Sequence, residues 1–249
     1  MAWSDCCAPI SSWSEAVNMS GGPGKATFVN ATFASIARRY DLMNRIMSAG
    51  QDQLWRRRAL ALLGSPPGSL ILDVGTGTGD FLPLLVGAGY RAIGVDFCFA
   101  MLQAGQGKLS ASDSMVAVTA GDARHLPFAD GQFDGVINAF LLRNVEDLPG
   151  VLAELRRVVR RGGRLVCLEI TWPTLPVFRQ AFSLYFGRVV PLVGGLVTGE
   201  PDAYAYLPRS VAAFVSAPRL AELLLESGWR DVTYRQLALG TIAIHSATK

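Results

Sequence analysis

The sequence predicts an α/β fold in which a Rossmann-like, mainly parallel sheet of seven strands carries helices on both faces. The first observation is an apolar run of strand length, residues 70–74, that leads into a glycine-rich turn and then a helical segment. The second is another apolar run, residues 91–97, whose acid Asp96 lies where ribose hydroxyls can be bound. A strand, a glycine turn, a helix and a strand ending in an acid form the opening βαβ unit of a nucleotide-binding sheet.

The glycine turn discriminates between classes of ligand. It reads LDVGTGTGD, and Gly75, Gly77 and Gly79 let the backbone turn tightly and approach a ligand closely. A dinucleotide fingerprint that starts at Gly75 needs a third glycine where this chain has Asp80. A pyrophosphate would meet a carboxylate there, whereas the sulfonium and ammonium groups of S-adenosylmethionine suit Asp73 and Asp80. We therefore expect an S-adenosylmethionine site; the alternative is a structural glycine turn with incidental acids.

Composition limits the remaining choices. The 249 residues are 50% hydrophobic and 17% charged, which allows one domain with a sizeable core and a greasy surface or pocket. A net charge of +3 is too weak to indicate nucleic acid. No stretch reaches the roughly 18 to 20 uncharged apolar residues of a membrane span, because Arg188 and Pro191 interrupt the longest candidate, residues 181–198. The four cysteines lack disulfide or zinc spacing and the start lacks a secretory signal, which indicates a reducing cytoplasm.

Ahead of the sheet, the sequence predicts a leader and two helices. Residues 1–26 are rich in Ser, Gly and Pro and are typical of a flexible leader. A helical period begins at Phe28, and a second helix covers residues 51–63. The three consecutive arginines that start at Arg56 indicate a solvated face, with contact to anionic lipid as the alternative.

Later segments complete the sheet and add an insertion. After the second strand we expect a helix to residue 109, strands at 115–119 and 133–138, a helix at 148–159 closed by Gly162-Gly163, and a strand at 164–170. Five prolines break residues 171–216 into apolar helical pieces, which indicates an insertion over the ligand crevice. A helix at 218–227 and strands at 229–236 and 239–246 then add an antiparallel C-terminal edge strand. The prediction is thus a single domain, 27–249, made of N-terminal helices (27–66), an α/β core (68–170), the insertion (171–216) and a C-terminal helix and strands (217–249).

Two further segments fall at strand ends, where open α/β sheets bind ligands. Asp122-Ala123 follows the third strand and can meet an adenine amino group, unless Asp122 is a plain loop acid. Arg143-Asn144 follows the fourth strand and brings a cation and an amide to the mouth of the crevice, unless Arg143 is a surface cation. The two histidines stand alone, far from any cysteine cluster, which favours structural roles.

Several segments are similar to those of a known family. They are FASIARRYDLMNRIMSAGQDQLWRR (33–57), LDVGTGTGD (72–80), VDFCFAMLQAG (95–105), GDARHLPFADGQFD (121–134), LRNVEDLPGVLAELRRVVRRGGRL (142–165) and AYAYLPRSVAAF (203–214). On these segments the chain, from about residue 28 to its end, resembles the ubiquinone/menaquinone biosynthesis C-methyltransferase family. The glycine motif alone indicates only a class I methyltransferase, whereas RYDLMN, LRNV and AYAYLPRS are more specific.

The resemblance implies a class I methyltransferase fold, S-adenosylmethionine as cofactor, and particular site residues. Cofactor contacts would fall on Thr78, Asp96, Asp122, Ala123 and, near the end of the fourth strand, Ala139. Tyr40, Asp80, Arg143 and Asn144 would lie beside the substrate. One residue departs from the pattern, because Leu141 stands where the family usually has glycine, and this puts the shape of the substrate slot in question.

The implied reaction methylates a ring carbon of a polyprenylated hydroquinone, foremost demethylmenaquinol to give menaquinol. Carbon is a poor nucleophile until a ring hydroxyl with a pKa of about 10 loses its proton. Arg143 suits the forming phenolate because its charge is permanent, and Asp80, directly or through a water, is the expected base with Tyr40 orienting it. No metal is expected. The alternatives are a class I methyltransferase for another small apolar or secondary-metabolite acceptor, and a binding protein that retains the fold without turnover.

A polyprenyl acceptor stays dissolved in the bilayer, so we expect a cytoplasmic protein with peripheral contact to the inner face of the membrane. The candidate surfaces are the N-terminal helices, 28–63, and the insertion, where Arg179 and Arg188 accompany many apolar side chains. The alternatives are that these side chains cap the core or bury a homodimer interface.

Overall fold

The computed structural model describes residues 23–108, 115–173 and 175–249, and its centre is a seven-stranded sheet in the order β3-β2-β1-β4-β5-β7-β6. The strands are β1 (Leu70–Val74), β2 (Arg91–Asp96), β3 (Val116–Ala120), β4 (Phe133–Ala139), β5 (Val159–Ile170), β6 (Arg230–Leu237) and β7 (Ile242–Thr248). The predicted fold class, a mainly parallel Rossmann-like sheet, is therefore confirmed.

The antiparallel strand lies one place further inside the sheet than the sequence analysis expects. Strands β1 to β5 pair in parallel, whereas β7 is antiparallel to both β5 and β6, so that β6 forms the edge. Burial explains the order. Most of β7 is buried, whereas most of β6 is exposed, and the more apolar strand takes the position that is covered on both sides.

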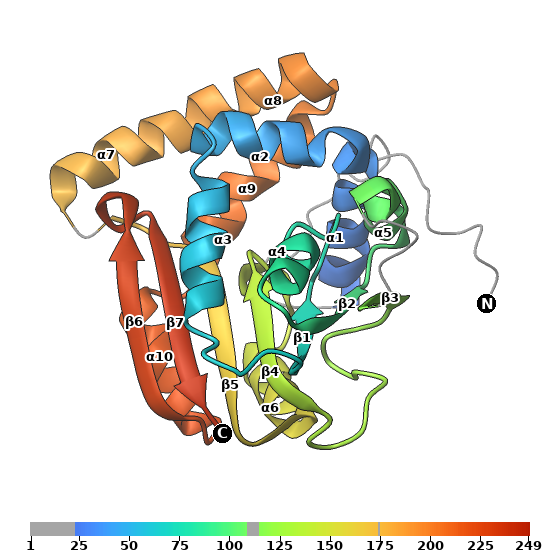
Figure 1. Cartoon of the computed structure of the whole chain (residues 1–249). Coiled ribbons are helices and arrows are strands. Elements are labelled where there is room, and N and C mark those ends of the chain that lie inside the picture. The colour runs from blue at the N-terminus through green and yellow to red at the C-terminus, as the bar shows by residue number, and fades with distance from the viewer. Residues whose placement is uncertain (1–22, 109–114, 174) are drawn as a thin grey trace.

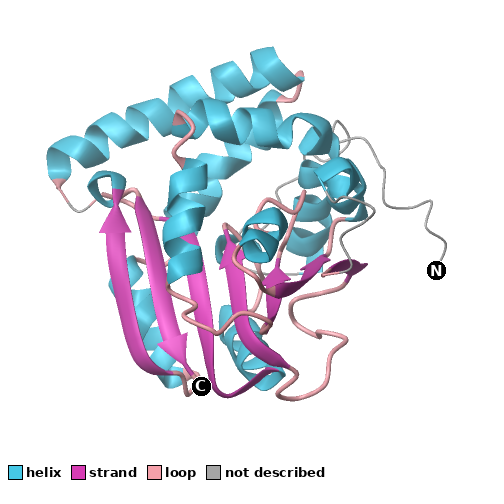
Figure 2. Cartoon of the chain, viewed as in Figure 1, coloured by secondary structure: helices cyan, strands magenta, loops and turns pink. Residues whose placement is uncertain are grey.

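Helices cover both faces of the sheet, as Figures 1 and 2 show. Helices α3 (Asp52–Ala61) and α4 (Leu82–Gly87) pack on one face, and α6 (Leu148–Val158) and α10 (Ala217–Glu226) pack on the other. Helix α5 (Phe99–Gly105) follows β2 and contacts β3. Each face has its own buried apolar cluster, which fixes the strand ends in place.

The N-terminal helices begin earlier than the hydrophobic period indicates. Helix α1 covers Pro23–Ile36, starting upstream of Phe28, and the first 22 residues of the predicted leader lie outside the described residues. A single 3₁₀ turn, Ala37–Arg39, separates α1 from α2 (Tyr40–Ser48). Tyr40 therefore begins a helix of its own, above the carboxyl ends of the strands (Figure 1).

The insertion forms a roof over the same ends of the strands (Figure 1). Helix α7 (Pro176–Leu184), a π-helical turn (Tyr185–Val189) and α8 (Val190–Thr198) form one continuous helix, and α9 (Pro201–Ala213) packs against it. The inner face of this roof and the N-terminal helices share an apolar cluster that includes Met43, Phe186 and Val190.

The continuous roof helix, Pro176–Thr198, is long and apolar enough by length and composition to cross a membrane. No membrane-spanning stretch was predicted from the sequence, because Arg188 and Pro191 interrupt the apolar run. Pro191 stands in the first turn of α8, directly after the wider π-helical turn, so the missing backbone N–H does not end the helix. Only the predicted length of the helix is thereby corrected, because one face of the helix packs against the rest of the protein.

The glycine pair that was expected to close the helix at 148–159 has another place. Helix α6 ends at Val158, and Gly162-Gly163 belongs to the long strand β5, where the register with β4 shifts. Gly162 has φ +74°, and a Cβ at Gly163 would lie 2.6 Å from the carbonyl oxygen of Asp134. The glycines therefore allow a bulge in the strand.

Candidate active site

The turn after β1 forms the floor of a cleft. Gly75, Gly77 and Gly79 have φ angles of 69°, 58° and 81°, a region that side chains other than hydrogen rarely allow. The backbone N–H groups of Gly75 and Thr76 donate to the carbonyl of Val95, at 2.8 and 3.0 Å, which ties the turn to β2. Gly75 and Gly77 thereby line the cleft with their backbone, whereas Gly79 is buried against Leu82.

Asp96 holds this turn at the end of β2. One carboxylate oxygen accepts from the N–H of Gly77 at 2.7 Å, and the other accepts from the N–H of Cys98 at 2.8 Å. Burial raises the pKa of Asp96, and the backbone donors only partly offset this effect. The carboxylate is thus fixed at the wall of a cleft of about 900 Å³. This cleft, here called the cofactor cleft, is also lined by Gly75, Gly77, Met101, Asp122, Ala123, Ala139, Leu141 and Asn144.

Asp122 lines the cofactor cleft and forms an ion pair with Arg124. The N–H of Arg124 donates to it at 2.9 Å, and the guanidinium of Arg124 lies 2.7 Å away and also contacts Glu146 at 3.0 Å. Although burial alone would raise the pKa of Asp122, Arg124 holds it below the usual value. Asp122 is therefore an ionised acceptor at the cleft wall, with Ala123 beside it.

A buried carboxylate without a full set of partners lies beneath the glycine turn. The hydroxyl of Thr76 donates to Asp73 Oδ2 at 2.6 Å, whereas Asp73 Oδ1 is buried without a hydrogen-bond partner. Burial raises the pKa of Asp73 to about 7. Such an orphaned acceptor fits a ligand that brings positive charge, as the sulfonium and ammonium of S-adenosylmethionine do. The residues present therefore fit the cofactor that the sequence predicts.

Asp80 lies between two cations. Its Oδ2 is 3.4 Å from Arg56 Nη2, and its Oδ1 accepts from Lys108 Nζ at 2.5 Å. Burial acts to raise the pKa of Asp80, but Arg56 and Lys108 outweigh it and hold the pKa below the usual range. A carboxylate held in its ionised form this firmly is a weak proton acceptor, so the geometry does not support the predicted role of Asp80 as base. It supports a role in fixing the two cations.

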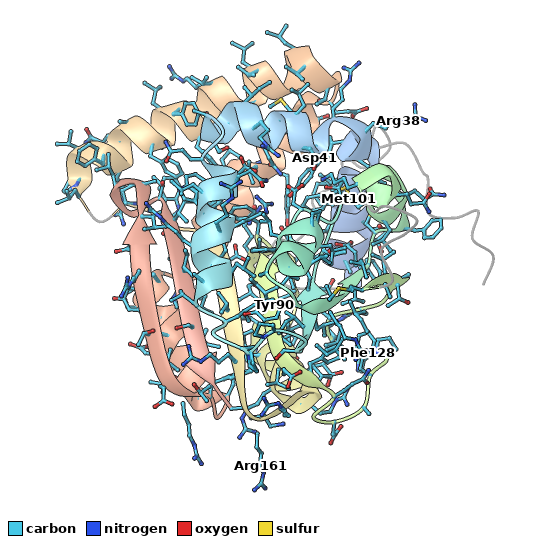
Figure 3. The ribbon with its side chains drawn as sticks, in the orientation of Figure 1. Arg38, Asp41, Tyr90, Met101, Phe128 and Arg161 are labelled. Carbon is cyan, nitrogen blue, oxygen red and sulfur yellow. The ribbon has the colours of Figure 1, made fainter. Side chains whose placement is uncertain are left out.

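Thr78 joins the same network. Its hydroxyl donates to Asp41 Oδ1 at 2.6 Å and accepts from Lys108 Nζ at 2.8 Å. Lys108 Nζ also lies 2.6 Å from Asp41 Oδ2, so the glycine turn is linked through one ammonium group to helix α2. Figure 3 labels Asp41 and Met101 in this region, with Arg161 at the opposite end of the molecule.

Arg56 is buried, contrary to the prediction of a solvated arginine run. It is 4% exposed, its Nη1 donates to Asp52 Oδ2 at 3.2 Å, and its guanidinium faces the rings of Phe81 and Phe140 at 5.8 and 5.5 Å. Its neighbours in the run are exposed. The spacing of residues along the helix could have predicted this burial, because Arg56 lies one turn after Asp52, on the face of α3 that is buried.

A second, larger cleft of about 1310 Å³ lies under the roof. Its walls are mainly apolar and aromatic, and Tyr40, Phe33 and Phe140 line both this apolar cleft and the cofactor cleft. The apolar cleft is further lined by Asn44, Met47, Trp55, Arg143, Phe182, Tyr185, Phe186, Tyr204, Tyr206 and Leu207. The two clefts therefore meet at Tyr40, where a methyl donor and an acceptor can be brought together.

Arg143 is the buried cation of the apolar cleft. It is 6% exposed, which excludes the surface-cation alternative, and its Nη1 lies 3.1 Å from Glu169 Oε2. Glu169, at the end of β5, is completely buried and also accepts from the N–H of Leu142 at 2.6 Å. Burial raises the pKa of Glu169, and the charge of Arg143 opposes this. Glu169 was not predicted as a site residue. It could have been recognised as a single acidic residue in an otherwise apolar strand.

Asn144 braces the loop around Arg143. Its Nδ2 donates to the carbonyl of Phe140 at 2.9 Å, and its Oδ1 accepts from the hydroxyl of Tyr206 at 3.1 Å. The unusual residue Leu141 packs on the cofactor side, since a Cβ at Gly75 would lie 2.8 Å from Leu141 Cδ1. The departure at Leu141 therefore shapes the cofactor cleft, of which it is a wall, and leaves the apolar cleft to other residues.

Neither histidine lines these clefts. His245 is buried, and its Nε2 lies 2.8 Å from the carbonyl of Ala217, whereas His125 is exposed on a loop. Within the described residues no group of three or more His, Cys, Asp and Glu side chains has an arrangement that could hold a metal ion. Cys167 is a buried free thiol.

The sheet order and the cofactor cleft are those of class I S-adenosylmethionine-dependent methyltransferases. Solved structures share the fold. A SAM-dependent methyltransferase of Thermotoga maritima aligns with a TM-score of 0.61 at 18% identity, covering 86% of this chain and 98% of that one. Phosphoethanolamine N-methyltransferase 2 of Haemonchus contortus, solved with S-adenosyl-L-methionine, aligns with a TM-score of 0.57 at 14% identity, covering 77% of this chain and 52% of that one.

The chain belongs to the ubiE/COQ5 methyltransferase family, whose model matches residues 23–249. It is 43% identical to a demethylmenaquinone methyltransferase of Roseiflexus castenholzii, covering 90% of this chain and 94% of that one. A demethylmenaquinone methyltransferase of Desulfitobacterium hafniense is 39% identical and covers 98% of both chains. A ubiquinone/menaquinone biosynthesis C-methyltransferase of Desulfotalea psychrophila is 42% identical over 93% of this chain and 92% of that one. The protein is thus a SAM-dependent C-methyltransferase.

Proposed function

We propose that this protein transfers the methyl group of S-adenosylmethionine to a ring carbon of a polyprenylated hydroquinone, converting demethylmenaquinol to menaquinol. The observation that carries the proposal is the meeting of the two clefts at Tyr40, with the buried Arg143 in the wall of the apolar one. A flat, apolar quinol suits aromatic walls, and one buried cation suits the charge that develops on its oxygen.

Arg143 activates the acceptor in this proposal. Loss of the hydroxyl proton pushes electron density onto the ring carbon, and the permanent charge of Arg143 stabilises the phenolate that results. Glu169 holds the guanidinium in place through an ion pair of 3.1 Å. Because Asp80 is paired with Arg56 and Lys108, its proposed part is to keep Arg56 beside Tyr40.

The methyl transfer itself depends mainly on the alignment of the methyl donor with the ring carbon of the acceptor. S-adenosylmethionine would supply the methyl group and leave as S-adenosylhomocysteine, and the acceptor would release the hydrogen of its ring carbon as a proton to water. Asp96, Asp122, Ala123 and the glycine turn would hold the donor, with Asp73 beneath the turn, and Tyr40 and Phe140 would hold the acceptor against it. Bringing donor and acceptor into line supplies much of the acceleration.

The test is transfer of a labelled methyl group to short-chain demethylmenaquinol, compared directly with a matched benzoquinol. We expect turnover of the naphthoquinol, and mass spectrometry should place the label on ring carbon. Turnover of the benzoquinol alone would reassign the substrate within quinone biosynthesis. Absence of transfer to both, with normal cofactor binding, would favour another apolar acceptor or a binding protein without turnover.

We further propose peripheral contact with the inner face of the membrane through the roof helix. Its inner side chains, among them Phe182 and Phe186, line the apolar cleft, whereas Leu192 and Leu196 on its outer face are 65% and 79% exposed. The helix has two arginines and no acidic residue. An apolar face flanked by cations suits the headgroup region of an anionic bilayer, from which a prenyl tail can enter the cleft.

Flotation with vesicles tests this contact against a homodimer interface on the same face. We expect binding to phosphatidylglycerol vesicles that falls with salt and is lost in Leu192→Ser/Leu196→Ser. Leu225→Ser is the matched control, because Leu225 is 56% exposed on α10, away from the roof. A protein that stays in the soluble fraction, and whose dimer dissociates in the double variant, would assign the face to self-association.

A further inference from the structure

The apolar cleft contains buried polar atoms that the protein itself leaves without partners. Arg143 Nε, Asn44 Nδ2 and the hydroxyl of Tyr204 are all buried without a hydrogen bond of normal geometry, and all three residues line this cleft. Asn44 also lies near the hydroxyl of Tyr40, because burial raises the pKa of Tyr40 and the amide of Asn44 opposes this. Most buried polar groups in proteins are paired, because an unpaired one costs about 1–3 kcal/mol. Three such atoms in one ligand-sized cleft indicate that a ligand with more than one polar atom completes them.

These atoms come from three different elements of the fold. Arg143 follows β4, whereas Asn44 lies on α2 and Tyr204 on α9. Helices α2 and α9 share one apolar cluster, to which Tyr40, Met43 and Tyr204 belong. Asn44 and Tyr204 are therefore part of the helical wall of the cleft, whereas Arg143 is part of the loop after β4.

The position of Tyr204 is built into the roof. Tyr204 is 3% exposed, and its ring lies against Gly194 of α8, where an added Cβ would come within 2.3 Å of the ring. Only glycine at this position leaves room for the ring. Burial raises the pKa of Tyr204, so its hydroxyl remains a neutral group that can both donate and accept. The packing thus fixes a hydroxyl inside an otherwise apolar wall.

We infer that Tyr204 and Asn44 bind the second ring oxygen of the acceptor, the one that Arg143 does not hold, so that the cleft selects aromatic rings with two oxygens. This inference rests on the proposed function and adds a subsite to it. A hydroquinone has oxygens at opposite ends of the ring, which matches two separated sets of polar atoms. An acceptor with a single hydroxyl would leave Tyr204 and Asn44 buried without partners, at a cost in affinity.

The experiment compares Tyr204→Phe with the wild type on two acceptors. One is a short-chain prenyl naphthalenediol, and the other is the matching naphthol that keeps only the hydroxyl next to the methylated carbon. Binding is measured by calorimetry with S-adenosylhomocysteine present, and kcat/KM by labelled methyl transfer. We expect the wild type to prefer the diol and Tyr204→Phe to lose about 5- to 20-fold on the diol. The same variant should change binding of the naphthol by less than about twofold.

Further variants separate this role from a general loss of packing. Asn44→Leu, close in volume, should also lower diol binding selectively, and it keeps the inference testable if Tyr204→Phe does not fold. Tyr234→Phe is the matched control, because Tyr234 lies 40% exposed on β6. Equal losses on the diol and the naphthol, or no loss on the diol, would overturn the second subsite while leaving the methyl transfer proposal intact. Failure of the wild type to methylate the diol would instead overturn the proposed function.

Discussion

The cofactor cleft and the apolar cleft meet at Tyr40, but one is formed largely by backbone and the other by side chains. The cofactor cleft is made of a glycine backbone turn and acids that follow neighbouring strands, such as Asp96 and Asp122. The apolar cleft is made of side chains from helices near both ends of the chain, such as Asn44 and Tyr204. A backbone cradle suits a ligand that does not change, whereas a wall of side chains can be altered residue by residue.

The two functions of the site, cofactor binding and acceptor binding, are therefore separable. Substitutions in the apolar cleft should change the choice and activation of the acceptor and leave cofactor affinity alone, and the reverse should hold for the cofactor cleft. Only residues at the junction, such as Tyr40 and Phe140, should affect both.

Arg143→Ala should lower turnover by about 1,000-fold, equivalent to about 4 kcal/mol, because the charge that stabilises the phenolate is lost. Cofactor affinity should stay within about twofold, since Arg143 lines only the apolar cleft. Single-turnover transfer and calorimetry measure the two quantities. Because Glu169 loses its partner, the double variant Arg143→Gln/Glu169→Gln is the control for folding, and it should be equally inactive. Matching losses in turnover and cofactor affinity would assign Arg143 to the cofactor.

The separation also explains how far the sequence could predict the molecule. The strands, the glycine turn and Asp96 could be predicted from local patterns. An apolar run, glycines that allow positive φ angles and an acid at the end of a strand can each be recognised within a few consecutive residues. Most residues that the sequence predicts for the cofactor line the cofactor cleft, whereas Asp73, Thr78 and Gly79 do not. The position of β7 inside the sheet was not predicted, because it depends on how two strands compare in burial.

The apolar cleft could be predicted only in part. Arg143 and Tyr40 were found through a family resemblance, whereas Glu169 and Tyr204 were not found. Tyr204 meets Gly194 only after the roof helices have packed together, and no local pattern records that contact. The role of Asp80 as base stays a prediction, and its pairing with Lys108 could not be foreseen because it depends on where α5 ends.

Arg56→Met should reduce the free energy of unfolding by about 3 kcal/mol, because Asp52 and Asp80 both lose a buried partner. Because the guanidinium of Arg56 faces the ring of Phe140, which lines both clefts, the substitution should weaken binding of both cofactor and acceptor. Thermal and urea unfolding measure the first effect, and calorimetry measures the second. Arg57→Met, in the exposed neighbour, should stay within about 0.5 kcal/mol. Equal stability of the two variants would restore the original interpretation of a solvated run.

Asp96→Ala should weaken S-adenosylmethionine binding by about 2 kcal/mol, or roughly 30-fold, through loss of charge-assisted ribose bonds. The N–H groups of Gly77 and Cys98 lose the carboxylate as well, so circular dichroism should first establish that the variant is folded. Acceptor affinity in the absence of cofactor should be unchanged. Unaltered cofactor affinity in the folded variant would refute this site.

The smallest effect concerns proton release at Asp73, whose pKa is raised to about 7 by burial. A carboxylate with a raised pKa stabilises the folded, cofactor-free protein fully below its unfolded pKa of about 3.8, and that contribution is lost as the pH rises through about 7. A cationic ligand requires the ionised form. Cofactor affinity should therefore fall by about tenfold, or 1.4 kcal/mol, for each pH unit below about 7, and binding should release a proton.

Calorimetry at about pH 6, in buffers that differ in ionisation enthalpy, measures this proton release directly. Asp73→Asn should bind the cofactor more weakly, release no proton and show a flat affinity over the same range, because the amide cannot ionise. The apolar cleft provides the comparison, since binding of a neutral quinol under the same conditions should take up or release no proton at Asp73. Proton release that persists in Asp73→Asn would assign the titration to another group and leave Asp73 as a structural partner of Thr76.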